Sequence, residues 1–294
     1  MQILYHYTSL AGALGILSNK SIWATDVRYL NDPHEFAHAL QFAKRFATQI
    51  YMEDDYLDEF GRMLRHATES VSAEDLFVTS FSETGDLLSQ WRGYCPTSGG
   101  VCLGFSYEKI LEFCHANGFH FEKCIYEHDR QASQVGALVN ECSSKFPMPK
   151  ISRQSFQSLP TSEQVDAHFS YHESLKEPGN KAQADIALNW LCAEIADLAP
   201  RFKNYGYHEE REWRLIARDP DFPKRFRVSS TGSYYVPYVE LPLLAGIGID
   251  SLKQIIVGPN PNQQRCINSL RMMASQNGFT DITLTPSEIP YNNW

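Results

Sequence analysis

The chain begins with the stretch LYHYTS (residues 4–9), and this stretch decides how the fold starts. An apolar and aromatic run of this kind is typical of a short strand, which places His6 almost at the N-terminus. Small and apolar residues follow over 9–17, and Thr8 or Ser9 suits the N-cap of a helix there. Building a core does not require His-Tyr-Thr at this position, so we interpret the segment as part of a functional site.

Composition places the chain among globular proteins. It has 294 residues, of which 43% are hydrophobic, and this is enough for one large domain or two small ones. A formal net charge of −9 argues against a protein that coats nucleic acid by bulk charge. No apolar run approaches the roughly 20 residues that span a bilayer, so we expect no membrane partner. Seven scattered cysteines and no secretory signal predict buried thiols in a reducing cytoplasm.

Helical and strand patterns alternate along the rest of the chain. Apolar residues at helical spacing predict helices over 33–52, about 55–68 and 185–203. Strands are predicted over 22–25, 76–82, 101–105, 121–126, 212–217, 225–229, 234–241, 254–257 and 282–285. Residues 130–182 are polar and rich in proline, which predicts an inserted helical excursion with long loops.

We therefore expect a single α+β domain over 1–294. Helices gather early and in the middle of the chain, with a helical segment over about 33–70, while strands dominate the rest. This order favours a mixed or antiparallel split sheet with flanking helices.

The stretch NDPHE (residues 31–35) predicts the start of the first long helix. Asp32 and Glu35 fit a capping box, and Pro33 suits the first helical position. An alternative stays open, in which Asp32 faces a cleft and orients His6 or an acceptor.

A candidate acidic pair lies in the stretch EEREWRLI (residues 209–216). If residues 212–216 form a strand, Glu212 and Arg214 share one face, and Glu210 then joins Glu212 on that face. Carboxylates so placed can stabilise positive charge that develops on a sugar carbon, or bind a ribose hydroxyl. The alternative is a solvated edge strand whose acids and arginine pair across the surface.

A second group of candidates surrounds the predicted strand over 76–82. Ser80 and Ser82 share one strand face, and a helical turn after the strand carries Trp91, Arg92 and Tyr94. Trp and Tyr rings stack on planar heterocycles, and Arg binds a pyrophosphate bidentately. The alternative makes the two rings core anchors and Arg92 the partner of an acid. A lone strand histidine such as His6 is also most often a satisfied core residue.

Taken in order, His-Tyr-Thr, Ser-x-Ser with an aromatic helix start, and Glu-x-Glu resemble the three motifs of the ADP-ribosyltransferase superfamily. More closely, the chain resembles the bacterial DUF2971 family. The shared pattern comprises Tyr5-His6-Tyr7-Thr8, Trp23-Ala24-Thr25, Leu30-Asn31-Asp32-Pro33-x-Glu35, Ser80-Phe81-Ser82, Leu88-x-Gln90-Trp91-x-x-Tyr94, Gly104-Phe105 and Glu212-Trp213-Arg214-Leu215. The resemblance implies an ADP-ribosyltransferase-like fold.

The resemblance also implies NAD as the substrate. His6 would bond a hydroxyl of the adenosine-side ribose, the Tyr7 backbone would hold the nicotinamide amide, and Tyr94 or Trp91 would stack on nicotinamide. The full set of implied NAD-binding residues is His6, Tyr7, Ser80, Ser82, Trp91, Arg92 and Tyr94.

Glu212, Glu210 and His6 are the implied catalytic residues. Glu212 would bond the nicotinamide-side ribose and stabilise the oxocarbenium-like transition state, and Glu210 would orient or deprotonate the acceptor. Two alternatives stay open. The chain mixes the patterns of two subfamilies, so either Tyr94 or the Ser80 and Ser82 pair is incidental, and Glu209 and Glu210 are exchangeable in role.

The function implied by the resemblance is transfer of ADP-ribose from NAD to a macromolecular acceptor, a protein or a nucleic acid, in a toxin or phage-defence role. No metal is expected. Two alternatives remain: a NAD glycohydrolase with water as acceptor, and a non-catalytic nucleotide-binding sensor module.

Overall fold

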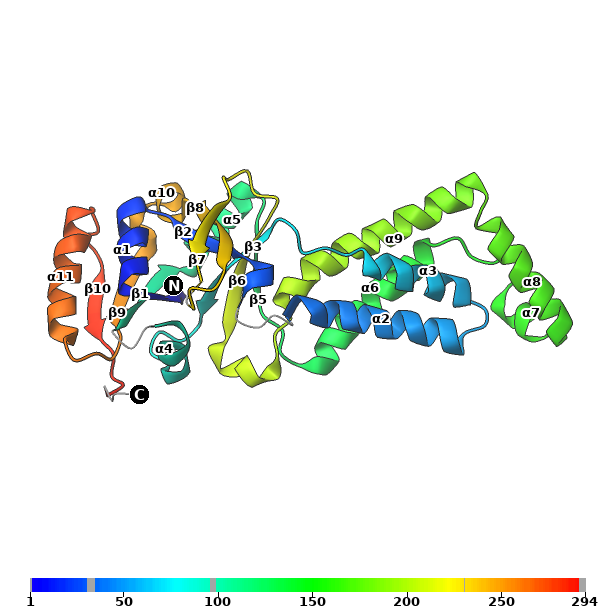
Figure 1. The fold of residues 1–294 in the computed structure, drawn as a ribbon, viewed down its shortest axis with the longest axis horizontal. Helices are drawn as coiled ribbons and strands as arrows, with labels where there is room; N and C mark the ends of the chain where they lie inside the picture. The colour runs from blue at the N-terminus through cyan, green and yellow to red at the C-terminus, as the bar shows by residue number, and fades with distance from the viewer. Residues whose placement is uncertain (1, 31–34, 96–98, 230, 291–294) are drawn as a thin grey trace. The chain divides into compact units, whose positions relative to one another are not determined.

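The computed structural model describes residues 2–30, 35–95, 99–229 and 231–290 (Figure 1). Contacts divide the chain into two compact units, each assembled from separate segments. Unit 1 comprises Met1–Asn31, Glu74–Cys124 and Lys203–Trp294, and unit 2 comprises Asp32–Ala73 and Ile125–Phe202. The helical segment expected over about 33–70 and the whole of the insertion expected over 130–182 therefore fall in unit 2.

Unit 1 is built on a ten-stranded sheet. Its strands are β1 (Ile3–Ser9), β2 (Ile22–Asp26), β3 (Leu76–Ser82), β4 (Gly100–Ser106), β5 (His120–Lys123), β6 (Glu212–Arg218), β7 (Arg225–Val228), β8 (Tyr235–Leu241), β9 (Leu252–Val257) and β10 (Thr283–Pro286). Its α-helices are α1 (Leu10–Asn19), α4 (Leu88–Tyr94), α5 (Tyr107–Asn117), α10 (Leu243–Ile247) and α11 (Gln263–Gln276). Because β9 and β10 run parallel and the other described pairs run antiparallel, the predicted mixed sheet with flanking helices is confirmed.

The sheet branches at β3. The order β10-β9-β4-β1-β3-β2-β8-β7 forms the main path, and β6, with β5 beside it, also pairs with β3. Strand β6 pairs with β3 from Leu76 to Ser82 and so fills one edge. On the other edge, β2 pairs with Phe77 and Val78, whereas β1 pairs with Ser82. Between these two pairings, β1 and β2 diverge.

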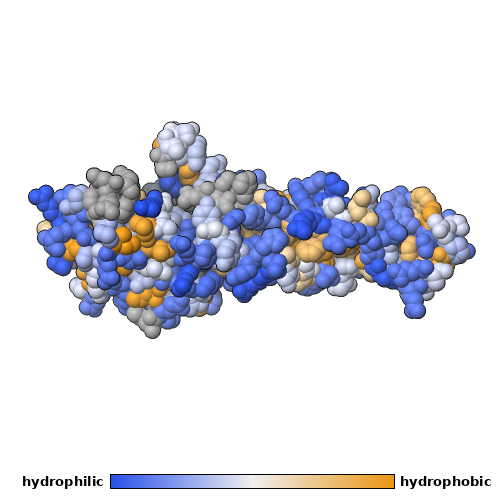
Figure 2. Space-filling model, turned by 90° about the horizontal axis from the view of Figure 1, so that it is seen from below, coloured by the Kyte–Doolittle hydropathy of each residue, from blue (hydrophilic) through white to orange (hydrophobic). Residues whose placement is uncertain are grey.

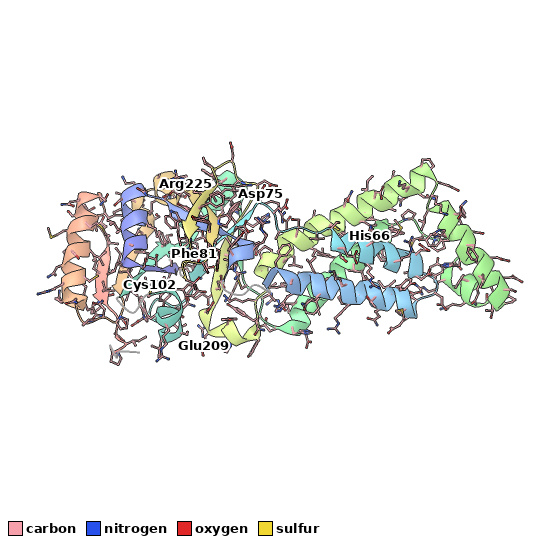
Figure 3. All side chains as sticks on the ribbon, viewed as in Figure 1. His66, Asp75, Phe81, Cys102, Glu209 and Arg225 are labelled. Carbon is pink, nitrogen blue, oxygen red and sulfur yellow. The ribbon has the colours of Figure 1, made fainter. Side chains whose placement is uncertain are left out.

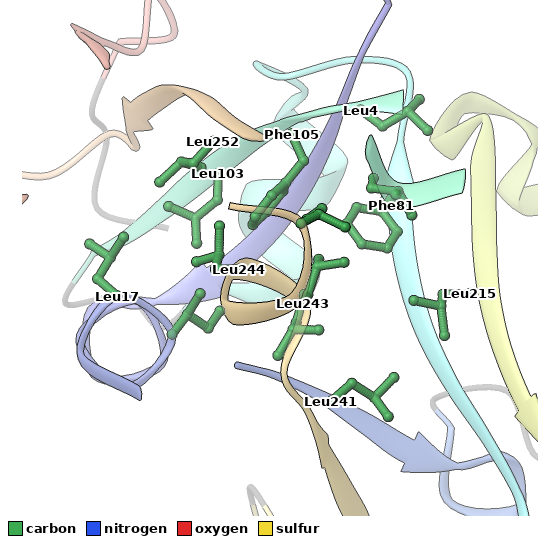
Figure 4. Packing of buried hydrophobic residues seen from close by; sticks show 14 of the residues in the cluster. Leu4, Leu17, Phe81, Leu103, Phe105, Leu215, Leu241, Leu243, Leu244 and Leu252 are labelled. Atoms are coloured by element: carbon green, nitrogen blue, oxygen red, sulfur yellow. The ribbon is translucent and has the colours of Figure 1, made fainter. Parts of the chain in front are cut away.

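The main core of unit 1 lies on one face of this sheet (Figure 4). Helices α1 and α10 cover apolar side chains that alternate along the strands. The fully or almost fully buried side chains include Leu4, Leu103, Phe105, Leu215 and Leu241 from strands and Leu17, Leu243 and Leu244 from helices. Burying each such side chain contributes about 1.5–3 kcal/mol, and this burial holds the helices on the sheet.

Unit 2 is mainly helical. Its α-helices are α2 (Glu35–Glu53), α3 (Asp58–Glu69), α6 (His128–Lys145), α7 (Arg153–Gln157), α8 (Thr161–Ser174) and α9 (Pro178–Leu198). They enclose a second core that includes Phe60, Leu64, Val135 and Leu191. Short connections join the helices of the segment for which the composition predicted long loops. The predicted capping box lies outside the described residues, since Asp32 and the side chain of Glu35 are not described.

The surface and the thiols agree with the composition. The face shown in Figure 2 is mostly hydrophilic, with scattered apolar patches. All seven cysteines are free, and four of them are buried. In the described part of the chain, no helix is both long enough and apolar enough to pass through a bilayer.

The packing of α2 on α3 depends on Gly61. A Cβ at this position would lie 2.6 Å from the backbone nitrogen of Tyr51 and 3.0 Å from the backbone oxygen of Ala47. We expect Gly61→Ala to force the two helices apart and to lower the free energy of unfolding by about 1–3 kcal/mol. Urea denaturation followed by circular dichroism measures this. Gly179→Ala in α9 is the matched control, because nothing lies within 4 Å of its added Cβ, and an equal loss in both variants would contradict the argument.

Candidate functional site

Four charged side chains of unit 1 meet where β6 begins. Glu212 is the first residue of β6, and Arg214 follows on the same strand face. Lys203 and Glu210 come from the segment before β6, which includes the short 3-10 helix η3 (Tyr205–Glu210). The side chains of Lys203, Glu212 and Arg214 are 4%, 4% and 2% exposed, and that of Glu210 is 12% exposed. Two carboxylates, Glu210 and Glu212, thus lie against two cations, Lys203 and Arg214.

Glu212 is bound through both of its carboxylate oxygens. Arg214 Nε donates to Glu212 Oε1 at 2.7 Å, and a terminal guanidinium nitrogen donates to Oε2 at 3.3 Å. Lys203 Nζ also donates to Glu212 Oε2 and lies 2.6 Å from Glu210 Oε2. Charge-assisted bonds of this kind fix the orientation of the carboxylate.

Glu210 reaches the cluster by a turn and not by strand alternation. The structure ends η3 at Glu210, and Arg211 then adopts a left-handed conformation with φ 42° and ψ 51°. The backbone oxygen of Arg211 accepts a hydrogen bond from the Glu83 backbone at 3.3 Å, which attaches this turn to the end of β3. The expected proximity of Glu210 and Glu212 is therefore present, and the strand begins at Glu212 as predicted, but a turn brings Glu210 to the cluster.

The surroundings move the pKa values of the two carboxyls in opposite directions. Burial works to raise the pKa of Glu212, but the charges and hydrogen bonds of Arg214 and Lys203 outweigh it and lower that pKa to about 2. Burial also raises the pKa of Glu210, and there Lys203 does not overcome the combined effect of burial and the Glu212 charge. Pairs of carboxyls with separated pKa values are typical of sites that divide acid and base roles.

Tyr94 and Ser82 lie at the same cluster. Burial raises the pKa of the Tyr94 phenol to about 12, and the charges of Lys203, Glu210 and the Glu212–Arg214 pair all act on it. Ser82 Oγ donates to the backbone oxygen of Glu210 at 2.7 Å. The structure thus brings together Tyr94, Ser82 and both predicted carboxylates.

The side chain of Trp91 on α4 packs against the side chain of Tyr7 on β1. Their rings meet edge to face with centroids 4.8 Å apart, and Trp91 is 3% exposed. Trp91 Nε1 donates to Asp86 at 2.6 Å, while the Tyr7 hydroxyl donates to the Thr84 carbonyl at 2.8 Å. These contacts favour the core-anchor alternative for Trp91, and Tyr94, the other ring of that alternative, packs against the same small core.

His6 projects from the opposite face of the sheet. Tyr5 lies opposite Ser82, and Ser82 lies opposite Glu212, so these three side chains share one face. Because successive strand residues alternate, His6 points to the other face, on which the main core lies. The structure therefore does not bring His6 to the carboxylate cluster.

A structural contact accounts for His6. Its Nδ1 lies 2.9 Å from the backbone oxygen of Ser80, and its ring centroid lies 5.9 Å from that of Phe81, which is labelled in Figure 3. A carbonyl only accepts, so Nδ1 carries the proton, and burial lowers the His6 pKa. Ser80 lies in the part of β3 between its pairings with β1 and β2, so this bond connects the diverging strands.

The remaining predicted residues lie apart, and one member of the cluster was missed. Arg92 is exposed on α4, and Ser80 is partly buried opposite Arg214 in the strand register. Lys203 was expected to end a helix over 185–203, but α9 ends at Leu198. No spacing pattern marks this lysine, and its only signal is its position beside the apolar Phe202.

The acid sensitivity of unit 1 tests the ionised state of Glu212. Since the folded pKa of about 2 lies below the ordinary 4.5, Glu212 contributes stability above pH 4.5 that is lost as pH falls toward 2. We expect Glu212→Gln to lower the free energy of unfolding at neutral pH by about 3 kcal/mol, because two buried cations lose their partner. The difference from wild type should shrink below pH 4.5 in urea denaturation followed by tryptophan fluorescence. Glu209→Gln is the control, and a difference independent of pH would contradict the assignment.

A second substitution tests the role of His6. Asn places a side-chain N–H close to the position of the imidazole Nδ1, so His6→Asn should retain the bond to Ser80 and most of the stability. His6→Ala should lose about 1–3 kcal/mol, since a buried carbonyl is left unpaired. Thermal unfolding measures both, and equal losses would contradict the proposed contact.

Comparisons with known proteins support the family resemblance. Residues 90–215 match the model of a family described as a protein of unknown function, DUF2971. The matched segment includes Tyr94, Lys203, Glu210, Glu212 and Arg214. Searches of curated proteins and of solved structures found no match.

Proposed function

We propose that the chain cleaves the nicotinamide–ribose bond of NAD and transfers ADP-ribose to a macromolecular acceptor. The observation that carries the proposal is the pair of carboxylates in one buried cluster, with a lowered pKa at Glu212 and a raised pKa at Glu210, beside the phenol of Tyr94. The order of the sequence motifs supports the same chemistry.

Glu212 suits the stabilisation of the departing ribosyl group. As nicotinamide leaves, positive charge develops on the ribose carbon, and an ionised carboxylate in low-dielectric surroundings stabilises that charge more than water does. With a pKa of about 2, Glu212 stays ionised at neutral pH.

Glu210 suits activation of the acceptor. A general base works best when its pKa lies near the operating pH, and the Glu210 pKa is shifted upward. Its side chain is also the most exposed of the four in the cluster, at 12%. Tyr94 has a neutral ring beside these groups and suits stacking on nicotinamide.

Substitutions at the cluster test the proposal through nicotinamide release from NAD and transfer of label from NAD to protein and nucleic-acid fractions. Glu212→Gln should lower release by about 100-fold or more. Because Glu212→Gln also loses stability, Glu212→Asp is measured beside it. The Asp variant keeps the negative charge but places the carboxylate one methylene farther from the substrate. It should therefore fold and still release nicotinamide more slowly than the wild type. Glu210→Gln should lower transfer more than hydrolysis, since water remains as an acceptor.

Glu209→Gln is the control for these measurements. Glu209, labelled in Figure 3, is exposed on η3 and accepts a 3.4 Å hydrogen bond from the hydroxyl of Ser89. The Glu209→Gln variant should release nicotinamide at the wild-type rate. No release by the wild type, or unchanged release in folded Glu212→Asp, would contradict the enzyme proposal.

One observation favours a second candidate, a non-catalytic nucleotide-binding module. Glu212 is 3% exposed, and both its oxygens are bound by cations, as in a structural ion pair. This candidate predicts that calorimetry detects binding of a NAD analogue without any nicotinamide release, and that Glu212→Asp changes affinity alone.

A further inference from the structure

Two histidines lie one turn apart on α8 in unit 2. His168 and His172 are four residues apart and so share one helix face. Their side chains are 30% and 33% exposed. Each approaches a carboxylate at the start of α3: His168 Nδ1 lies 3.2 Å from Asp58 Oδ1, and His172 Nδ1 lies 2.8 Å from Glu59 Oε1.

These contacts decide which ring nitrogen is available. An ionised carboxylate only accepts hydrogen bonds, so the Nδ1 that His172 uses to bond Glu59 carries the proton, and Nε2 of that neutral ring carries a lone pair. The 3.2 Å contact of His168 Nδ1 with Asp58 favours the same protonation in the second ring. Within residues 35–95 and 99–229, neither Nε2 has a hydrogen-bond partner. Each ring points Nε2 away from its carboxylate, because the two nitrogens lie on opposite sides of the imidazole.

The carboxylate behind His172 is itself held in place. Arg62 donates to Glu59 Oε2 from Nε at 2.9 Å and from a terminal nitrogen at 2.7 Å. The other oxygen of Glu59 is the one that faces His172. The ring is therefore oriented by a fixed acceptor.

We propose that His168 and His172 bind a divalent transition-metal ion of the zinc class through their Nε2 atoms. Histidines at this helical spacing are a recurrent pair of zinc ligands, and metal-bound histidines usually donate their other N–H to a carboxylate or carbonyl. Among the described residues no group of three or more His, Cys, Asp or Glu side chains is placed to hold a metal ion. The protein thus supplies two ligands, and water completes the coordination.

The metal has a defined effect on unit 2. Coordination at Nε2 keeps the proton on Nδ1 and so maintains the hydrogen bond from His172 to Glu59 and the contact of His168 with Asp58. A ligand that binds only the folded state also stabilises that state, and the gain grows with the logarithm of ligand concentration once the concentration exceeds Kd. This site does not depend on the proposed NAD chemistry, which lies in unit 1.

The test is calorimetric titration of the full chain with Zn²⁺ under reducing conditions. Asn is the informative replacement, because its side-chain N–H still donates to the carboxylate while the Nε2 ligand is removed. We expect the wild type to bind one Zn²⁺ per chain. In His168→Asn and in His172→Asn the Zn²⁺ affinity should fall by about tenfold or more. Asp58→Asn and Glu59→Gln keep both ligands and should also weaken binding by about tenfold.

His66→Asn is the matched control. His66 lies on α3, is labelled in Figure 3, and has a side chain that is 89% exposed. The His66→Asn variant should bind Zn²⁺ as the wild type does. Zn²⁺ should raise the midpoint of thermal unfolding of this variant and of the wild type. Absence of binding at millimolar Zn²⁺, or binding that is unchanged when both α8 histidines are replaced by Asn, would overturn the proposal.

Discussion

The balance of charge around Glu212 is the constraint on which this part of the structure depends. Removing an ion from water costs several kcal/mol, so a carboxylate that is 3% exposed requires close cations. Arg214 supplies one from the same strand, and Lys203 supplies the other while also binding Glu210. The path of the chain from 203 to 212 is therefore set by the need to pair these four groups.

The same cluster connects elements that are distant in sequence. Ser82 at the end of β3 donates a hydrogen bond to the backbone oxygen of Glu210. The charges of the cluster also act on the phenol of Tyr94 at the end of α4. On the other side of the sheet, His6 bonds to Ser80 where β1 and β2 separate. The hydroxyl of Thr79 donates to the Trp23 carbonyl at 2.8 Å and bridges the same gap toward β2. Side chains here replace the missing strand-to-strand bonds.

Local patterns predicted most elements, and the misses have physical causes. The strand over 76–82 agrees with β3, because its β-branched and aromatic residues are buried on both faces. The helix expected to reach Lys203 ends at Leu198, since Pro200 removes a backbone donor and a 3-10 turn follows. Residues 130–182 show no clear helical period in α8 because that helix is largely polar, and contacts such as that of His172 with Glu59 hold it in place.

The sequence by itself determined the α+β class, the alternation that puts Glu212 beside Arg214, and the candidates Ser82, Tyr94 and Glu210. The class and the alternation follow from periods of two and 3.6 residues, which are local properties, and the three candidates follow from their residue types and from the order of the motifs. Only the tertiary structure decided that Lys203 joins the cluster and that His6 faces the other side of the sheet. Both depend on strand register and on a chain reversal, because the side chains that meet there come from segments far apart in the sequence.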